Sequence, residues 1–229
     1  MTSNVVMDLS HNNPSVDFGL AAVDGIVGVV HKATQGTGFA DPQYSARRQA
    51  AADAGLLWGA YHFGTGADPV AQANWFLRTA TPGPQDLVVL DFEENPAGTT
   101  MSLDQARTFI QTVQAKIGRA PGLYGGSLLK QSLTGISDPI LEACWLWWAQ
   151  YGPVAAIPPN WDNYTLWQYT DGHHGNPPFA VNGVGVCDRD QYQGSVDQLT
   201  AAWATGTLIV PAAAASAAAG NGGGQSGPS

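Results

Sequence analysis

Charged residues are scarce in this chain, and basic residues are the scarcest. Only 9 of its 229 residues are Lys or Arg, against 18 Asp or Glu, which leaves a net charge of −9. Proteins that bind nucleic acid neutralise its phosphates with Lys and Arg, and electrostatic membrane anchors use the same residues. The composition therefore argues against a nucleic-acid partner and against a membrane anchor.

Long apolar runs are also missing, so no membrane-spanning helix is expected. The first residues lack the charged start and apolar centre of a signal peptide, which predicts a protein made and folded in a cytoplasm. The two cysteines, Cys144 and Cys187, have neither metal-knuckle nor redox spacing, and we expect buried free thiols. No His-Glu-x-x-His pattern is present, and we expect no metal and no other cofactor.

Apolar residues make up 44% of the chain and include eight Trp, a composition typical of a compact enzyme. From Pro211 onward the sequence is almost entirely Ala, Gly, Ser and Pro. We predict one folded unit over residues 1–210, and a disordered tail or linker over residues 211–229. A monomer is expected.

Strand-like and helix-like segments alternate along the chain. Such alternation predicts a mainly parallel sheet covered by helices, and eight strands are enough to close a barrel. An open, doubly wound sheet is the alternative, but no Gly-rich phosphate loop follows the first strand. The fold class is therefore α/β, an irregular eight-stranded barrel with few helices in its second half. The strands are expected at 5–9, 25–31, 57–63, 87–91, 122–124, 145–151, 164–169 and 184–188.

Helix starts have clear signals in four places. Asp41-Pro42 and Asp68-Pro69 each combine a capping side chain with a Pro suited to the first helical position. Capping boxes begin at Ser102 and Ser195. These signals predict four helix N-termini.

The run from Leu87 to Glu93 is the most informative segment. Its four apolar residues predict a buried strand, which is followed by Asp91 and Glu93. Side chains alternate along a strand, so these two carboxylates share a face, with Cα atoms about 6.5–7 Å apart. Repulsion and low dielectric would push their pKa values apart, as hydrolysis of a glycosidic bond requires. Alone, however, so short a pattern more often describes a helix cap or a solvated strand end.

Other strands also end on polar side chains. Because barrel active sites lie at the carboxyl ends of the strands, Asp8 and Asp188 should join Asp91 and Glu93 on one rim. The candidate substrate-binding residues are the polar and aromatic side chains near the other strand ends, namely Lys32, Tyr61, His62, Tyr124, Trp147 and Gln168.

Seven ordered motifs resemble glycoside hydrolase family 25, the Chalaropsis-type lysozymes found in many phage endolysins. The resemblance covers roughly residues 5–195. Its motifs are Met7-Asp8-Leu9-Ser10, Val30-His31-Lys32-Ala33-Thr34, Gly59-Ala60-Tyr61-His62-Phe63, Leu90-Asp91-Phe92-Glu93, Leu146-Trp147-Trp148-Ala149-Gln150-Tyr151, Leu166-Trp167-Gln168-Tyr169 and Asp188-Arg189-Asp190.

The resemblance implies an N-acetylmuramidase that cleaves the β-1,4 bond between N-acetylmuramic acid and N-acetylglucosamine in peptidoglycan glycan strands. It implies that Glu93 is the general acid, and that Asp91 stabilises the 2-acetamido group or the developing positive charge. Asp8 and Asp188 would complete the acidic pocket. Retaining, inverting and substrate-assisted mechanisms all stay open.

Two other functions compete with this one. A family 18-type chitinase would need an Asp two residues before Asp91, where this chain has Val89. A non-catalytic carbohydrate-binding barrel would be expected to have lost some of the four carboxylates, and all four are present. The missing signal peptide favours a phage endolysin, held in the host cytoplasm before it reaches the bacterial cell wall, over a secreted bacterial autolysin.

Overall fold

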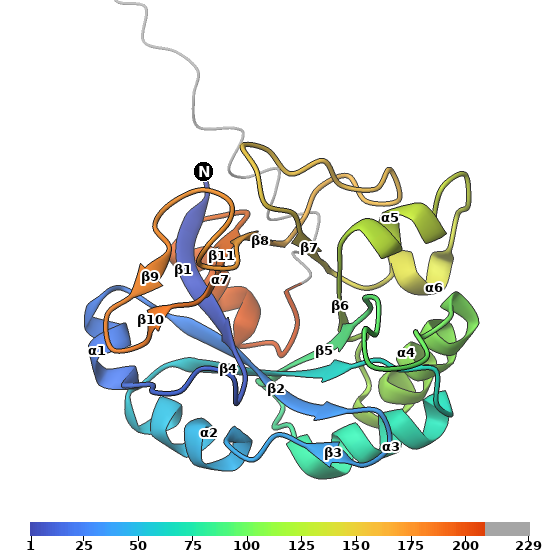
Figure 1. Cartoon of the computed structure of the whole chain (residues 1–229), viewed down its shortest axis with the longest axis horizontal. Helices are drawn as coiled ribbons and strands as arrows, with labels where there is room; N and C mark the ends of the chain where they lie inside the picture. Colours follow the sequence, from blue (N-terminus) through green and yellow to red (C-terminus); the bar gives the residue numbers. More distant parts are fainter. Residues whose placement is uncertain (209–229) are drawn as a thin grey trace, which may run out of the picture.

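A closed ring of strands forms the centre of the computed structural model, which describes residues 1–208 (Figure 1). In these residues a nine-stranded sheet closes on itself, with β3 (Phe39–Ala40) only extending β2. The tail predicted at 211–229 lies outside the described residues. The eight strands of the ring are β1 (Ser3–Leu9), β2 (Gly28–Gln35), β4 (Leu57–Phe63), β5 (Leu87–Asp91), β6 (Gly122–Gly125), β7 (Leu146–Ala149), β8 (Leu166–Thr170) and β11 (Asp188–Tyr192).

β1 closes the barrel, because it pairs with β2 in parallel and with β11 in antiparallel orientation. β11 is antiparallel to β8 as well, whereas the ring from β1 through β2 and β4 to β8 is parallel. The predicted last strand, 184–188, is therefore wrong. Its first part forms β10 (Gly185–Val186), which pairs with β9 (Ala180–Val181) in a separate hairpin. Asp188 begins β11 instead of ending a strand.

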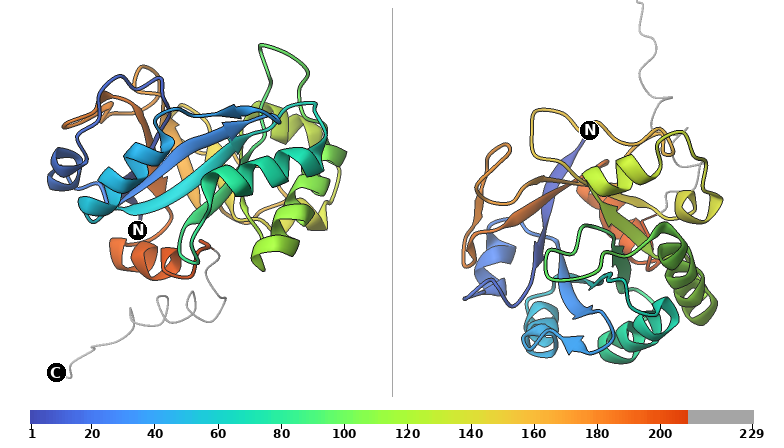
Figure 2. Two further views of the ribbon diagram at one scale, coloured as in Figure 1. Left: turned by 90° about the horizontal axis from the view of Figure 1, so that it is seen from below. Right: turned by 45° about the vertical axis from the view of Figure 1, so that its right-hand side comes forward.

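The helices are distributed unevenly around the ring, as the sequence predicts. The three longest, α2 (Tyr44–Asp53), α3 (Pro69–Ala80) and α4 (Leu103–Ile117), lie outside the first strands (Figure 2). The later connections hold only the short α5 (Ser127–Ser132) and α6 (Pro139–Glu142). The two remaining helices are α1 (Phe18–Val23) and α7 (Val196–Trp203).

Three of the four predicted helix starts are confirmed. Asp68 caps α3 with Pro69 in its first turn, and capping boxes open α4 and α7 at Ser102 and Ser195. The prediction at Asp41 is wrong, because α2 begins at Tyr44 and has no side-chain cap. The Asp41 carboxylate accepts hydrogen bonds from the backbone N–H groups of His11 and Gln43 instead.

Apolar side chains form two cores, one on each side of the sheet. Val6, Val30, Val89 and Trp147 belong to the cluster inside the barrel, whereas the cluster between barrel and helices contains residues such as Phe76, Phe109 and Leu90. Because both faces are covered, β5 is buried along its whole length.

The indole of Trp203 on α7 joins the interior cluster and donates a hydrogen bond to the carbonyl of Trp58 at 3.0 Å. A Cβ on Gly28 would lie 2.6 Å from this indole, so glycine is required there. α7 is thus anchored against the amino-terminal ends of β2 and β4.

Cys144 and Cys187 are buried free thiols, as predicted. In the described part of the chain no helix combines the length and the apolar character needed to cross a membrane.

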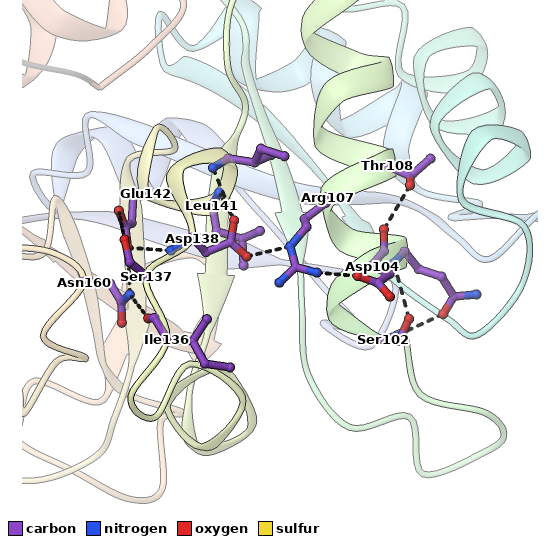
Figure 3. A network of polar contacts seen from close by, with 12 residues as sticks. Ser102, Asp104, Arg107, Thr108, Ile136, Ser137, Asp138, Leu141, Glu142 and Asn160 are labelled. Carbon is purple, nitrogen blue, oxygen red and sulfur yellow. Dashed lines mark hydrogen bonds and ion pairs between the residues drawn. The ribbon is translucent and has the colours of Figure 1, made fainter.

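A polar network joins α4 to α6 on the side of the barrel (Figure 3). The Arg107 guanidinium donates to the buried Asp138 carboxylate at 2.8 Å and also pairs with Asp104. Asp138 in turn caps α6 by accepting from the N–H groups of Ile140 and Leu141. One carboxylate therefore holds a short helix and a long helix together.

We expect Asp138→Ala to lower the free energy of unfolding by about 2 kcal/mol, because it removes a helix cap and a charge-assisted hydrogen bond together. Asp104→Ala is the matched control. The Asp104 side chain is 91% exposed, so its loss should cost less than about 1 kcal/mol. Urea denaturation of both variants measures the difference, and equal losses would contradict this account.

Candidate active site

A pocket of about 310 Å³ opens at the end of the barrel where the parallel strands have their carboxyl termini. Every predicted catalytic and substrate-binding residue except His62 lines it. The lining residues are Asp8, Ser10, Asn12, Lys32, Tyr61, Phe63, Asp91, Glu93, Tyr124, Trp147, Tyr151, Gln168 and Asp188.

Strand alternation places the two carboxylates of β5. Leu87 and Val89 point into the barrel, whereas Val88 and Leu90 point toward the helices. Asp91 continues the inward series at the end of the strand, and Glu93 follows two residues later. Asp91 is 4% exposed, and its Oδ1 has no hydrogen-bond partner among residues 1–208.

Asp8 and Asp188 face each other across the seam of the barrel, since they are partners in the antiparallel pairing of β1 with β11. Gln168 on β8 fixes the Asp8 carboxylate by donating from Nε2 to Oδ2 at 2.8 Å. Its own Oε1 accepts from the hydroxyls of Tyr124 at 2.9 Å and Tyr151 at 3.0 Å. The amide thereby links one pocket acid to two aromatic residues.

Burial raises the pKa of every carboxyl in the pocket. It is the largest cause for Asp91, to which the charge of Glu93 adds, and the pKa of Asp91 lies well above its usual range. Burial and then the charge of Asp188 raise the pKa of Asp8 well above its usual range too. Burial also raises the pKa of Glu93, and that of Asp188 to about 6.

Within residues 1–208, Lys32 is the one Lys or Arg that lines this pocket. Burial lowers its pKa, while the charges of Asp91, Asp41 and Glu93 oppose that change. Its ammonium donates to Gln35 Oε1 at 2.8 Å and lies 4.9 Å from the centre of the Phe63 ring. The Lys32 charge in turn lowers the pKa of Asp91 and of Glu93, in opposition to burial.

Residues 7–176 match the family model described as glycosyl hydrolases family 25, which spans all but the last of the predicted motifs. The chain is a member of glycosyl hydrolase family 25. It is therefore a glycoside hydrolase, as its carboxylate-lined barrel pocket also suggests.

Individual relatives agree with this membership. Lysozyme M1 of Streptomyces globisporus is 30% identical over 85% of this chain and 69% of its own length. The N,O-diacetylmuramidase of a Chalaropsis species is 31% identical over 77% of this chain and 92% of its own length. The crystal structure of the bacterial lysozyme from Streptomyces coelicolor superposes with a TM-score of 0.78 at 29% identity, covering 89% of this chain and 98% of that one.

His62 does not lie in the family 25 pocket, and the prediction that it binds substrate is wrong. Its side chain is 0% exposed and stacks on Phe109 between the barrel and the helices. Its Nδ1 lies 2.7 Å from Thr34 Oγ1 and its Nε2 lies 3.1 Å from Gln72 Oε1. The physical reason is strand alternation, because Tyr61 points inward and its neighbour must point outward.

Four pocket residues were absent from the predicted set, namely Ser10, Asn12, Phe63 and Tyr151. Phe63 is the last residue of β4, and Tyr151 lies two residues after the end of β7. Including the aromatic residues at or just after the end of each strand among the candidates would have found both. Ser10 and Asn12 lie in the loop after β1, where no periodic pattern indicates which side chains turn inward.

Two further depressions flank the pocket and share residues with it. One, of about 560 Å³, includes Glu93, Tyr124 and Tyr151 together with Trp148 and Lys130. The other, of about 730 Å³, includes Glu93, Lys32 and Phe63. Glu93 lines all three cavities, so it stands at their junction.

We expect Asp188→Asn to stabilise the protein at pH 7 and not at pH 4. Folding raises the pKa of Asp188 to about 6. The folded state therefore holds this proton more tightly than the unfolded chain, and stability is lost as the pH rises from about 4 through 6. The amide cannot ionise, so the variant should gain about 2–3 kcal/mol at pH 7. Urea denaturation at both pH values checks this, and an equal gain at both would contradict it.

Proposed function

We propose that this family 25 enzyme is an N-acetylmuramidase that hydrolyses the β-1,4 bond between N-acetylmuramic acid and N-acetylglucosamine in peptidoglycan. The observation that carries the proposal is the position of Glu93, which lines three adjoining cavities and lies in the same pocket as the buried Asp91 carboxyl. A long glycan strand that crosses these cavities would bring its glycosidic oxygens past Glu93. The similarity to a lysozyme and to an N,O-diacetylmuramidase supports this substrate.

Glu93 is the proposed general acid. Burial and the nearby Asp188 charge raise the pKa of its carboxyl, which favours the protonated form needed to donate to a leaving glycosidic oxygen. Lys32 opposes the shift and would stabilise the carboxylate that remains after the proton is given up.

Asp91 is proposed to orient the 2-acetamido group or to stabilise the positive charge that develops on the sugar ring. Its buried Oδ1 has no partner within residues 1–208, so it is available to accept the N–H of an acetamido group. Asp8 and Asp188 complete the acidic wall opposite. Tyr61, Tyr124, Trp147 and Gln168 would hold the sugar.

Expression as a phage endolysin that lyses its host stays a prediction from the sequence, and so does a monomeric state. We likewise propose that residues 1–210 are the catalytic unit. The wall chemistry tested below does not depend on these points.

Digestion of purified Gram-positive peptidoglycan, followed by borohydride reduction, identifies the bond that is cut. We expect reduced muramic acid. Glu93→Gln should lower the rate of release by about 10²–10⁴-fold, because it removes the proton donor and keeps the shape of the side chain. Glu142→Gln is the matched control, since Glu142 has the same side chain and lines none of the three cavities. Reduced glucosamine from wild type, or full activity in Glu93→Gln, would overturn the assignment.

We expect Asp91→Asn to lower kcat about 100-fold or more and to leave KM nearly unchanged, because charge stabilisation acts mainly on the transition state. Asp104→Asn, on the exposed surface of α4, should retain wild-type kinetics. Steady-state kinetics on soluble glycan fragments separate the two constants. A rise in KM at constant kcat would mean that Asp91 only binds substrate.

A further inference from the structure

Asp190 is a carboxyl inside the apolar interior of the barrel, one layer below the pocket. It follows Asp188 by two residues on β11, so both side chains point inward. It is 0% exposed, and its strand neighbours are Val6 on β1 and Gln168 on β8. Asp190 does not line the pocket and so does not belong to the surface that contacts substrate.

The two oxygens of Asp190 have different surroundings. Oδ1 accepts a hydrogen bond from the indole Nε1 of Trp147 at 2.6 Å. Oδ2 is buried and has no donor within the described residues. Asp8 follows Val6, the β1 partner of Asp190, by two residues, so its carboxyl lies on the same inward face and interacts electrostatically with Asp190. The Asp8 carboxyl also has no proton to offer if both groups are ionised. Two adjacent buried carboxylates of like charge repel each other strongly.

The charged and titratable groups around Asp190 do not neutralise it. Arg189 is the adjacent cation, but its side chain points to the other face of β11, where it donates to the carbonyl oxygens of Ala180 and Asn4. The groups that interact electrostatically with Asp190 are Asp8 from β1, Asp188 and Arg189 from β11, Tyr169 from β8 and Cys187 before β11. Burial is the largest cause that raises the pKa of Asp190 well above its usual range.

One proton resolves the arrangement. With a proton on Asp190 Oδ2, each hydrogen bond of the network has one donor and one acceptor. Trp147 then donates to Asp190, Asp190 donates to Asp8, and Gln168 donates to Asp8 from the other side. Asp8 is the better place for the negative charge, because it lines the solvent-accessible pocket whereas Asp190 is wholly enclosed. The hydrogen bond from Gln168 lowers the pKa of Asp8, and the charge of Asp190, which raises that pKa, is absent once Asp190 holds the proton.

We propose that Asp190 is a positioning residue that remains protonated and donates from Oδ2 to Asp8, which it holds as an oriented, ionised carboxylate on the wall of the active site. The inference rests on the proposed function, in that Asp8 acts there on the sugar. It adds a proton-holding residue below the pocket, which touches no substrate.

Asp190→Asn tests this directly, because an amide keeps both hydrogen bonds at every pH. Its Oδ1 still accepts from Trp147, and its Nδ2 still donates to Asp8. We expect activity within about threefold of wild type at the pH optimum. In wild type, loss of the shared proton adds to the alkaline fall in activity that ionisation of the Glu93 acid already causes. In Asp190→Asn the alkaline limb should therefore be less steep than in wild type, since the amide donor does not titrate.

Asp190→Leu is the comparison variant, because the leucine side chain has a similar volume and carries neither a hydrogen-bond donor nor an acceptor. It should lose activity about tenfold or more at all pH values, because a hydrogen bond to a charged group is removed. Its fold is checked by near-UV circular dichroism. If it does not fold, the Asp190→Asn profile decides the matter alone.

Thermal unfolding provides a readout that does not depend on activity. A raised pKa means that the folded state loses stability as the pH rises past the value of an unfolded Asp, about 4. The melting temperature of Asp190→Asn should therefore exceed that of wild type at pH 8, and the difference should shrink toward pH 4. The melting temperatures test the protonation of Asp190 even if wild type releases no muramic acid ends. That outcome would contradict the proposed function and not the inference about Asp190.

Three outcomes would overturn the inference. Asp190→Asn could be folded but inactive at neutral pH, in which case the site needs the charge of Asp190. Its pH profile and pH-dependent melting could match those of wild type, in which case no proton resides there. Asp190→Leu could be folded and fully active, in which case Asp8 needs no donor from below.

Discussion

The pairing of β1 with both β2 and β11 is the constraint on which the rest of this structure depends. It turns a sheet with two edges into a closed barrel, and its register sets Asp8 directly opposite Asp188. Without that seam the carboxylates of β1 and β11 would lie on opposite edges of an open sheet, far from Asp91. The pocket is thus a consequence of closure.

Closure also creates the electrostatic problem that characterises the site. Four carboxyls surround a small cavity whose floor is an apolar core, and a fifth, Asp190, lies within that core. Burial is the largest cause of every one of their pKa shifts. The barrel supports acid chemistry because its low-dielectric interior disfavours ionisation of the carboxyls. The Gln168 amide lowers the pKa of Asp8 and the Lys32 charge lowers that of Asp91, so both oppose the effect of burial.

The antiparallel orientation of β11 explains why Asp188 lies in the pocket as predicted, although the strand assigned to it was wrong. The sequence interpretation took Asp188 as the exit of a parallel strand. It is the entrance of an antiparallel one. Reversing the strand brings its amino end to the same rim, so Asp188 still joins the pocket. The reversal also turns Asp190 down into the core, where a carboxyl must find hydrogen-bonding partners among Trp147 and Asp8.

The sequence by itself determined the alternation of strands and helices that favours a barrel, most helix starts, and the inward pair Asp91 and Glu93, because these depend on periodicity and capping over a few residues. The tertiary structure alone decided that His62 turns away from the pocket while Tyr61 enters it, and that Ser10 and Asn12 join the lining. It also decided that Asp190 meets Asp8. Such contacts join residues up to about 180 positions apart in the chain, and no local pattern records the register that brings them together.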